Sequence, residues 1–311
     1  MIKWGIRIFG IVALILGVLF WWLLLSGSNA ARSAPGLFAL DDWRSKASAP
    51  TQQLPISIRI LEIGRDTAPP FAAQAGRFGA PVAISYNAVE IIYPERRIII
   101  GGAVDRPTAE GMALSDTEWH FSDAAYAELT EAMLSADQVL MTHEHLDHVM
   151  AIARHPEPAA LAPNLVLNAP QIAALPLFAD GTLDPALSGL QSGLSGEVVS
   201  IAPGVVIVPA AGHTPGSQMV FIGLQNGAEI LLIGDIVWNM GAIEALKTRP
   251  VLTQYMVFRP NYEDRAAIKQ QVRALHDMMA QHPELVVLPA HDRDWLMAAA
   301  ETDGIVFEAA E

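Results

Sequence analysis

The chain has 311 residues, of which 52% are hydrophobic and 17% are charged, so it can build a sizeable core and is not an intrinsically disordered protein. Its formal net charge of −14 argues against a nucleic-acid partner, because binding a polyanion depends on clustered Lys and Arg. The absence of cysteine excludes disulfides, thiolate metal ligands and cysteine nucleophiles. Any metal ion would have to be held by His and carboxylate side chains.

The N-terminal segment is long and apolar enough to enter a membrane. Residues 8–25 are uncharged and mostly hydrophobic, and Lys3 and Arg7 precede them. The two cations predict that the N-terminus stays in the cytoplasm and that the rest of the chain is exported to the periplasmic or extracellular side. Residues 1–32 are predicted to be a transmembrane anchor, which their length favours. The alternative is a signal segment cleaved near Ala30, which would release a secreted or periplasmic protein.

A linker and one domain are predicted to follow. Residues 33–55 are rich in Ala, Ser, Pro and Gln without sustained periodicity, as is typical of a tether between a membrane and a domain. No second composition boundary follows, so residues 56–311 are predicted to form a single domain. Its first β-forming runs are interpreted as consecutive strands of one sheet, at 56–63, 81–86, 90–93 and 97–100.

The middle of the domain alternates between helix and strand patterns. Ser122 is predicted to cap a helix in which Tyr126, Leu129 and Met133 share one face. A buried strand at 139–141 follows. Further strands are predicted at 165–167, 205–208, 219–224 and 230–233, with the last two joined by a turn at Asn226 and Gly227.

The last predicted helix begins near Asn261 and carries Glu263 and Asp264 in its first turn. Its apolar stripe should pack on a sheet, and a strand at 285–288 follows it. Residues 308–311 are interpreted as a solvated tail. Strands in two groups with interspersed helices predict an α+β sandwich, in which two sheets pack face to face under a cover of helices.

A dense cluster of metal-binding side chains follows the strand at 139–141. His143, His145, Asp147 and His148 lie within six positions, and burying them beside a core strand would be costly unless a cation paired with them. Residues two apart in an extended segment point to the same side, so His143 and His145 can bind one ion. The chain then turns, which allows Asp147 and His148 to bind a neighbouring ion.

Three later segments offer further ligands, each directly after a predicted strand. They are Gly-His-Thr-Pro-Gly around His213, Gly-Asp at Asp235, and Pro-Ala-His-Asp around His291. Asp292 is expected either to support a ligand imidazole or to be solvated. Glu144 is expected to face outward. The four histidines outside these motifs are assigned structural or surface roles: His120, His155, His276 and His282.

These motifs, in this order, resemble the metallo-β-lactamase superfamily over about residues 56–295. The resemblance implies an αβ/βα sandwich with a metal site at one edge, and a catalytic domain at 56–311. It also implies a dinuclear hydrolase in which a hydroxide held between two zinc ions attacks the substrate and Asp147 protonates the leaving group. Iron, manganese and cobalt remain open as alternatives to zinc. Carried over by position, one metal would be bound by His143, His145 and His213, the other by Asp147, His148 and His291, and Asp235 would bridge them.

The sequence motifs around His213 and His291 are most similar to those of the N-acyl homoserine lactonase group, which implies a small-molecule lactone or ester as substrate. Phosphodiesterase, thioesterase or β-lactam hydrolase activity on the same dinuclear site stays open, as does an iron-dependent oxidoreductase. Two positions depart from the group: Trp238 stands where Tyr is typical, and Gly101 and Gly102 replace an Asp-Thr-Gly turn. Residues 238–260 either line an apolar substrate channel or cover the core.

Overall fold

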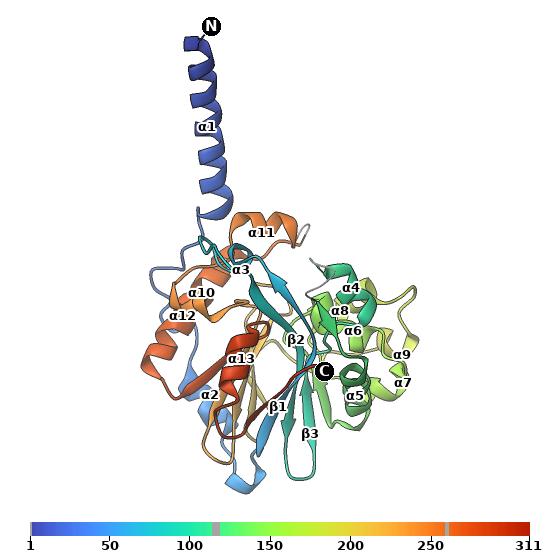
Figure 1. Ribbon diagram of the computed structural model, residues 1–311. Coiled ribbons are helices and arrows are strands. Elements are labelled where there is room, and N and C mark those ends of the chain that lie inside the picture. The colour runs from blue at the N-terminus through green and yellow to red at the C-terminus, as the bar shows by residue number, and fades with distance from the viewer. Residues whose placement is uncertain (1, 114–118, 259–260) are drawn as a thin grey trace.

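The computed structural model describes residues 2–113, 119–258 and 261–311. In this part of the chain two β-sheets pack face to face and helices cover their outer faces, so the predicted α+β sandwich is confirmed (Figure 1). Helix α1 (Ile2–Leu24) stands away from this body.

The first sheet has the strand order β11-β1-β2-β3-β5, and a short strand β4 also pairs with β1. The β1–β2 and β2–β3 pairs are antiparallel, whereas β3 pairs with β5 and β1 with β11 in parallel. The segments predicted as two strands, at 81–86 and 90–93, form the single strand β2, because the residues between them continue the pairing with β1. The bounds are β1 (Ser57–Ala68), β2 (Val82–Ile92), β3 (Arg97–Ile100), β4 (His120–Phe121), β5 (Gln138–Leu140) and β11 (Ile305–Glu308).

The second sheet has the order β10-β9-β8-β7-β6. The predicted turn between β8 and β9 is present, and Gly227 adopts a φ of 88°, which favours glycine. The predicted strand at 165–167 is wrong, because Leu165 forms only one isolated bridge, to Val139. The bounds are β6 (Val199–Ala202), β7 (Val205–Pro209), β8 (Gln218–Gly223), β9 (Glu229–Gly234) and β10 (Leu285–Pro289).

Helices flank both sheets. Ser122 caps α5 as predicted, since its side chain accepts a hydrogen bond from the N–H of Ala125. The bounds are α2 (Leu40–Ala47), α3 (Pro70–Ala73), α4 (Arg106–Met112), α5 (Asp123–Ser135), α6 (Leu146–Ala153), α7 (Pro158–Leu161), α8 (Ala169–Phe178), α9 (Pro185–Ser188), α10 (Met240–Glu244), α11 (Val251–Met256), α12 (Arg265–Gln281) and α13 (Arg293–Ala299), with 3₁₀ turns at Thr51–Gln53 and Ala162–Asn164.

Three expectations are wrong, for the start of the last helix, for the C-terminal tail and for the linker. Helix α12 begins after its cap Asp264 rather than near Asn261, and α13 follows it. The expected solvated tail at 308–311 includes the last residue of β11 and the buried Ala310, whose N–H donates to Glu62. Within the expected linker, α2 packs on the second sheet and buries Trp43. The linker expectation failed because Trp43 is buried, and the tail expectation failed because β11 pairs with β1.

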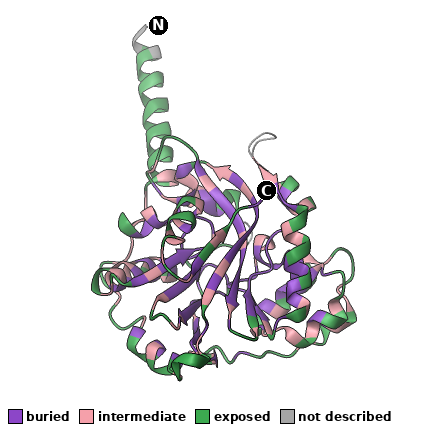
Figure 2. Ribbon diagram, turned by 60° about the horizontal axis from the view of Figure 1, so that its bottom comes forward, coloured by how far each residue is buried: buried purple, intermediate pink, exposed green. Residues whose placement is uncertain are grey.

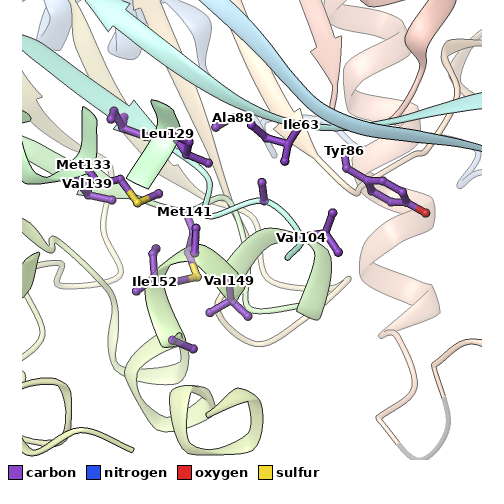
Figure 3. Close-up of a cluster of buried hydrophobic side chains, with 14 of the residues drawn as sticks. Ile63, Tyr86, Ala88, Val104, Leu129, Met133, Val139, Met141, Val149 and Ile152 are labelled. Carbon is purple, nitrogen blue, oxygen red and sulfur yellow. The ribbon is translucent and has the colours of Figure 1, made fainter. Parts of the chain in front are cut away.

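The core forms three apolar layers, whose residues are among the buried ones coloured purple in Figure 2. One layer lies between the sheets and contains Ile58, Ile91 and Val220. A second packs α5 and α6 on the first sheet, where Leu129, Met133 and Val149 meet (Figure 3). The third packs α2 and α12 on the second sheet.

Helix α1 is long and apolar enough to cross a membrane between Ile6 and Leu24, and none of that stretch is buried inside the protein. A signal sequence near an N-terminus has the same properties. Both the anchor and the cleaved signal therefore remain open. The C-terminal end of α1 lies beside α3 and α11, at the top of the domain in Figure 1.

Candidate metal centre

The seven side chains predicted as metal ligands meet at one edge of the sandwich, on segments that follow strand ends. His143 and His145 follow β5, and Asp147 and His148 lie in the first turn of α6. The other three follow strands of the second sheet: His213 after β7, Asp235 after β9 and His291 after β10. Only His145 and Asp147 are partly exposed, and the other five are buried.

Asp235 lies between two groups of imidazoles. Its Oδ2 is 3.4 Å from Nε2 of His213 and 3.7 Å from Nε2 of His143. Its Oδ1 is 3.1 Å from Nε2 of His291 and 3.6 Å from Nε2 of His148. One carboxylate therefore faces a different imidazole pair with each oxygen.

The clustered atoms form three overlapping groups in which potential ligand atoms lie within 4.8 Å of one another. In addition, Asp147 Oδ2 is 3.3 Å from His291 Nε2, which ties Asp147 to the third group. The groups are His143, His145, His213 and Asp235; His143, Asp147 and His148; and His148, Asp235 and His291. Two adjacent positions for cations, sharing Asp235, are consistent with this arrangement.

The rings of three histidines are oriented through Nδ1, which leaves Nε2 directed at the centre. Nδ1 of His291 lies 2.8 Å from the carbonyl oxygen of Ser85, and Nδ1 of His213 lies 2.7 Å from Oε1 of Glu263. Nδ1 of His143 lies 3.1 Å from Oγ1 of Thr142. An imidazole whose Nδ1–H donates in this way presents a lone pair on Nε2, which is the form that binds a metal.

The donor set fits a pair of divalent cations. Nε2 of His143, Nε2 of His213 and Oδ1 of Asp235 are buried and have no hydrogen-bond partner in the described part of the chain. Buried polar atoms without a partner cost free energy, and several such atoms aimed at one point indicate an ion that would satisfy them. Imidazole and carboxylate ligands suit zinc, and they also suit iron, manganese and cobalt.

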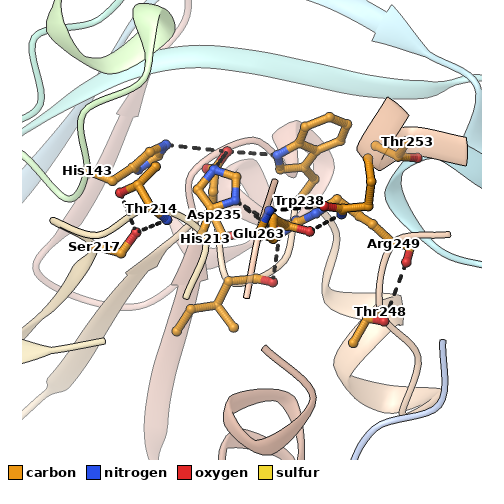
Figure 4. A network of polar contacts seen from close by, with 12 residues as sticks. His143, His213, Thr214, Ser217, Asp235, Trp238, Thr248, Arg249, Thr253 and Glu263 are labelled. Carbon is orange, nitrogen blue, oxygen red and sulfur yellow. Dashed lines mark hydrogen bonds and ion pairs between the residues drawn. The ribbon is translucent and has the colours of Figure 1, made fainter. Parts of the chain in front are cut away.

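Two buried charged residues that the sequence analysis did not assign to the site support His213. Glu263, expected in the first turn of a helix, instead precedes the cap of α12, and its Oε1 contacts both His213 and the guanidinium of Arg249 (Figure 4). Arg249 also donates to the carbonyl oxygen of Asp235 at 2.7 Å. Arg249 and Glu263 are 2% and 7% exposed. No local pattern marks this pair, because its partner His213 is far away in the sequence.

Trp238 stabilises Asp235 directly, since its indole Nε1 donates to Asp235 Oδ2 at 2.7 Å. A tyrosine hydroxyl could both donate and accept at this position, whereas an indole only donates. The indole of Trp238 therefore fixes one proton on this contact and directs it at the carboxylate.

Two neighbouring carboxylates differ from expectation. Glu144 is buried, not outward-facing, and accepts hydrogen bonds from Oγ1 of Thr214 at 2.7 Å and the N–H of Gly216 at 2.9 Å. It thereby joins the His143 and His213 segments. Asp292 is also buried and accepts from the N–H of Met240 and from Nδ2 of Asn239, so it is not solvated, and these partners are not imidazoles of the cluster. Both stabilise loops that carry the centre.

The electrostatics of the cluster favour ionised carboxylates and divide the imidazoles. Burial opposes a charge on His213 and His291, but Asp235 outweighs it and raises the pKa of both, so these two would release a proton on binding a metal. Burial lowers the pKa of His143. Burial and the neighbouring His213 lower the pKa of His145 to about 3. Burial alone would raise the pKa of Asp147, but His148 and His291 outweigh it and lower that pKa to about 2. Burial likewise opposes ionisation of Glu263, yet Arg249 and His213 lower its pKa to about 2. Deprotonated ligands at neutral pH are what metal binding requires.

A cavity of about 580 Å³ opens at the centre and is lined by His145, Asp147, Asp235 and His291. Its walls are mostly apolar. Met256 and Phe258 line it, whereas Met240 lies in the core. The segment 238–258 therefore both lines the cavity and covers the core. Arg259 and Pro260, the last two positions of the expected segment, lie outside the described residues. The apolar wall is formed by Phe71, Met112, Leu177, Phe178, Leu252 and Met256.

Proteins named as metal-dependent hydrolases are among those to which this chain is similar. No protein-family model matches the chain. Proteins named probable metallo-hydrolase from Mycobacterium bovis and Mycobacterium tuberculosis are each 24% identical over 178 residues, which is 53% of this chain and 57% of theirs. The chain thus spans little more than half the length of the curated relatives it matches.

Solved structures share the fold at low sequence identity. An N-acyl homoserine lactone hydrolase with N-hexanoyl-L-homoserine bound at its catalytic metal centre has a TM-score of 0.56 and 12% identity, over 79% of this chain and 96% of that one. A probable metal-dependent hydrolase from Staphylococcus aureus has a TM-score of 0.55 and 18% identity, over 77% and 90%. The expected resemblance to metallo-β-lactamase superfamily hydrolases and N-acyl homoserine lactonases is confirmed at the level of the fold.

Proposed function

We propose that this chain is a dinuclear metal-dependent hydrolase that cleaves a lactone or ester with a hydroxide held between two zinc ions. The observation that carries the proposal is Asp235, whose two oxygens face separate histidine pairs at 3.1–3.7 Å beside an apolar cavity. Two bound divalent cations supply a nucleophile near neutral pH by lowering the pKa of water, and they polarise the oxygen of the bond under attack.

The ligand assignment follows the geometry of the cluster. His143, His145 and His213 would hold one ion on the Oδ2 side of Asp235, and His148, His291 and Asp147 would hold the other on the Oδ1 side. Glu263 and the carbonyl of Ser85 keep the outer nitrogens of His213 and His291 engaged, so that Nε2 points inward.

In this proposal Asp147 would move the proton of the reaction. It lines the cavity, and its pKa of about 2 makes it a carboxylate at neutral pH. It would therefore have to take up the proton of the attacking hydroxide before it could deliver that proton to the leaving group. The apolar wall of the cavity would bind the non-reacting part of the substrate and exclude water from it.

Substrate class is supported by likeness in fold alone. A solved neighbour carries a hydrolysed lactone, N-hexanoyl-L-homoserine, at its metal centre, and the present cavity has room for a ligand of that size next to its polar edge. The apolar wall of the cavity favours an uncharged acyl group over a phosphodiester.

The test combines metal analysis of the purified full-length protein with a screen of lactones, aryl esters, thioesters, phosphodiesters and β-lactams. We expect two zinc equivalents, and turnover of a lactone or ester that is lost in His145→Ala. His282→Ala, a substitution remote from the cluster, should retain both. Full turnover by a metal-loaded His145→Ala protein would refute the dinuclear mechanism, and turnover of phosphodiesters or β-lactams alone would refute the substrate class.

A further inference from the structure

The C-terminal end of α1 is attached to the domain by specific contacts. The ring of Phe20 stacks on Phe78 at 5.9 Å with an interplanar angle of 18°, and Trp22 lies 6.3 Å from Tyr255 in α11. Just after the helix, the N–H of Thr248 donates to the carbonyl oxygen of Ser28 at 2.7 Å. These contacts fix the face of the domain from which the helix emerges.

The same face carries one wall of the cavity. Phe71 lines the cavity, and its ring lies 6.4 Å from that of Phe78. In α11, Met256 lines the cavity and directly follows Tyr255, the partner of Trp22. A continuous set of aromatic and apolar side chains therefore connects the apolar helix to the cavity.

This rim exposes large apolar side chains to solvent. Met256 is 72% exposed and Phe78 is 54% exposed, and Tyr255, Val257 and Tyr262 are also exposed. A grouped set of exposed apolar residues beside a pocket indicates an interaction surface rather than a chance surface position. Tyr255 and Tyr262 lie 5.7 Å apart, so the tyrosines of this surface are neighbours.

The charge of the rim differs from that of the rest of the chain. The protein has 33 Asp and Glu residues, yet the sequence contains none at 24–39, 67–83 or 245–262, the segments that surround the foot of α1. These segments carry Arg and Lys instead, among them Arg32, Arg77 and Lys247. The start of α12 also reaches this face, where Arg265 donates to the carbonyl of Gly27, and it carries the exposed Asp264. A surface with few carboxylates and several cations is suited to lipid headgroups, many of which are anionic.

The position of α1 sets how deep its contacts with Phe78 and Tyr255 would lie in a bilayer. Phe20 lies four residues before the helix ends at Leu24, which is about 6 Å along the axis at 1.5 Å per residue. If α1 spans a bilayer, Phe78 at the level of Phe20 therefore reaches the boundary between headgroups and acyl chains. Trp and Tyr side chains such as Trp22 and Tyr255 favour that zone.

From these observations we infer that the mouth of the cavity rests on the surface of the bilayer that α1 spans. The occupant of the apolar rim is the lipid surface. The substrate is then an amphiphilic ester or lactone dissolved in the membrane, which enters the cavity from the lipid at the rim that α3 and α11 form together. This second part rests on the proposed function, whereas the docking of the rim does not.

Docking is tested in the full-length protein by depth-dependent quenching. The chain has no native cysteine, so Met256→Cys accepts a single fluorescent label, and Val306→Cys on β11 provides an exposed apolar control. Each protein is reconstituted in vesicles of phosphatidylcholine and phosphatidylglycerol that contain lipids with a nitroxide on the upper acyl chain. We expect quenching at position 256 to be severalfold stronger than at 306. Equal quenching at the two positions would overturn the docking.

Substrate entry is tested by how an ester is presented. Phe78 contributes to the rim without lining the cavity, so Phe78→Gln should leave turnover of a water-soluble ester unchanged and lower turnover of a vesicle-dissolved long-chain ester about tenfold. Val306→Gln should change neither. An equal fall on both esters would overturn entry from the lipid. Absence of turnover on any ester would refute the proposed function, while the quenching result would still decide the docking.

Discussion

The two halves of the metal centre are held by different kinds of support. On the Oδ2 side of Asp235, His213 is oriented by the side chain of Glu263, whose charge is paired with the buried Arg249. On the Oδ1 side, His291 is oriented by a main-chain carbonyl, that of Ser85 in β2. A side-chain support can be removed by one substitution, whereas a main-chain support cannot. The two halves should therefore respond very differently to mutation outside the ligands.

The largest effect is expected where the halves meet. Asp235→Ala removes the one carboxylate that faces both imidazole pairs, so turnover should fall to background and the metal content should fall on both sides. Metal analysis and kcat/KM measure this, with Asp41→Ala on the surface as control. Wild-type metal content together with wild-type turnover would mean that Asp235 does not link the two halves.

Glu263→Gln should have the next largest effect and should act on one half. Loss of the carboxylate weakens the orientation of His213 and is expected to lower metal affinity about 10–100-fold. It also leaves Arg249 buried without its partner, at a cost of about 3–5 kcal/mol of stability. Titration with a competing chelator and denaturant unfolding measure the two effects. Glu284→Gln, an exposed carboxylate beside Arg44, is the matched control, and an equal response in both variants would contradict the asymmetry.

Trp238→Phe should have a moderate effect. It removes the hydrogen bond to Asp235 Oδ2 and keeps an aromatic ring in the cavity wall. Since hydrogen bonds to charged groups contribute about 1.5–3 kcal/mol, kcat should fall by about tenfold or somewhat more, with a smaller change in KM. A change confined to KM would show that the indole acts on substrate binding and not on the carboxylate.

The smallest effect is expected from Ser85→Ala, on the Oδ1 side of Asp235. Ser85→Ala keeps the carbonyl that contacts His291 and removes only the hydroxyl, which accepts a weak hydrogen bond from Asn87 at 3.3 Å. Metal affinity should stay within about threefold of wild type, because the carbonyl that orients His291 is unchanged and the long hydrogen bond that is lost contributes about 0.5 kcal/mol. A loss as large as that of Glu263→Gln, in the same chelator titration, would show that both halves depend on side-chain support.

The sequence predicted site residues correctly where they lie close together in the chain, and it failed where a partner lies on a distant segment. His143, His145, Asp147 and His148 lie within one short segment after a strand, so their residue types and spacing predicted a cluster that the structure brings together. The expectation for Glu144 failed because its partners, Thr214 and Gly216, lie on another segment. Glu263 resembled a carboxylate in the first turn of a helix, and nothing nearby in the sequence indicated His213.

The sequence by itself determined most of the longer strands, the apolar N-terminal helix and which side chains could bind metal, because periodicity, turn residues and ligand types are properties of neighbouring positions. Tertiary structure alone decided the rest: the burial of Trp43 by the expected linker, the pairing of β11 with β1, and the placement of α1 against α11 beside the cavity. Those contacts join residues that are far apart in the chain. They form because apolar surfaces on separate elements are buried together, which no single segment encodes.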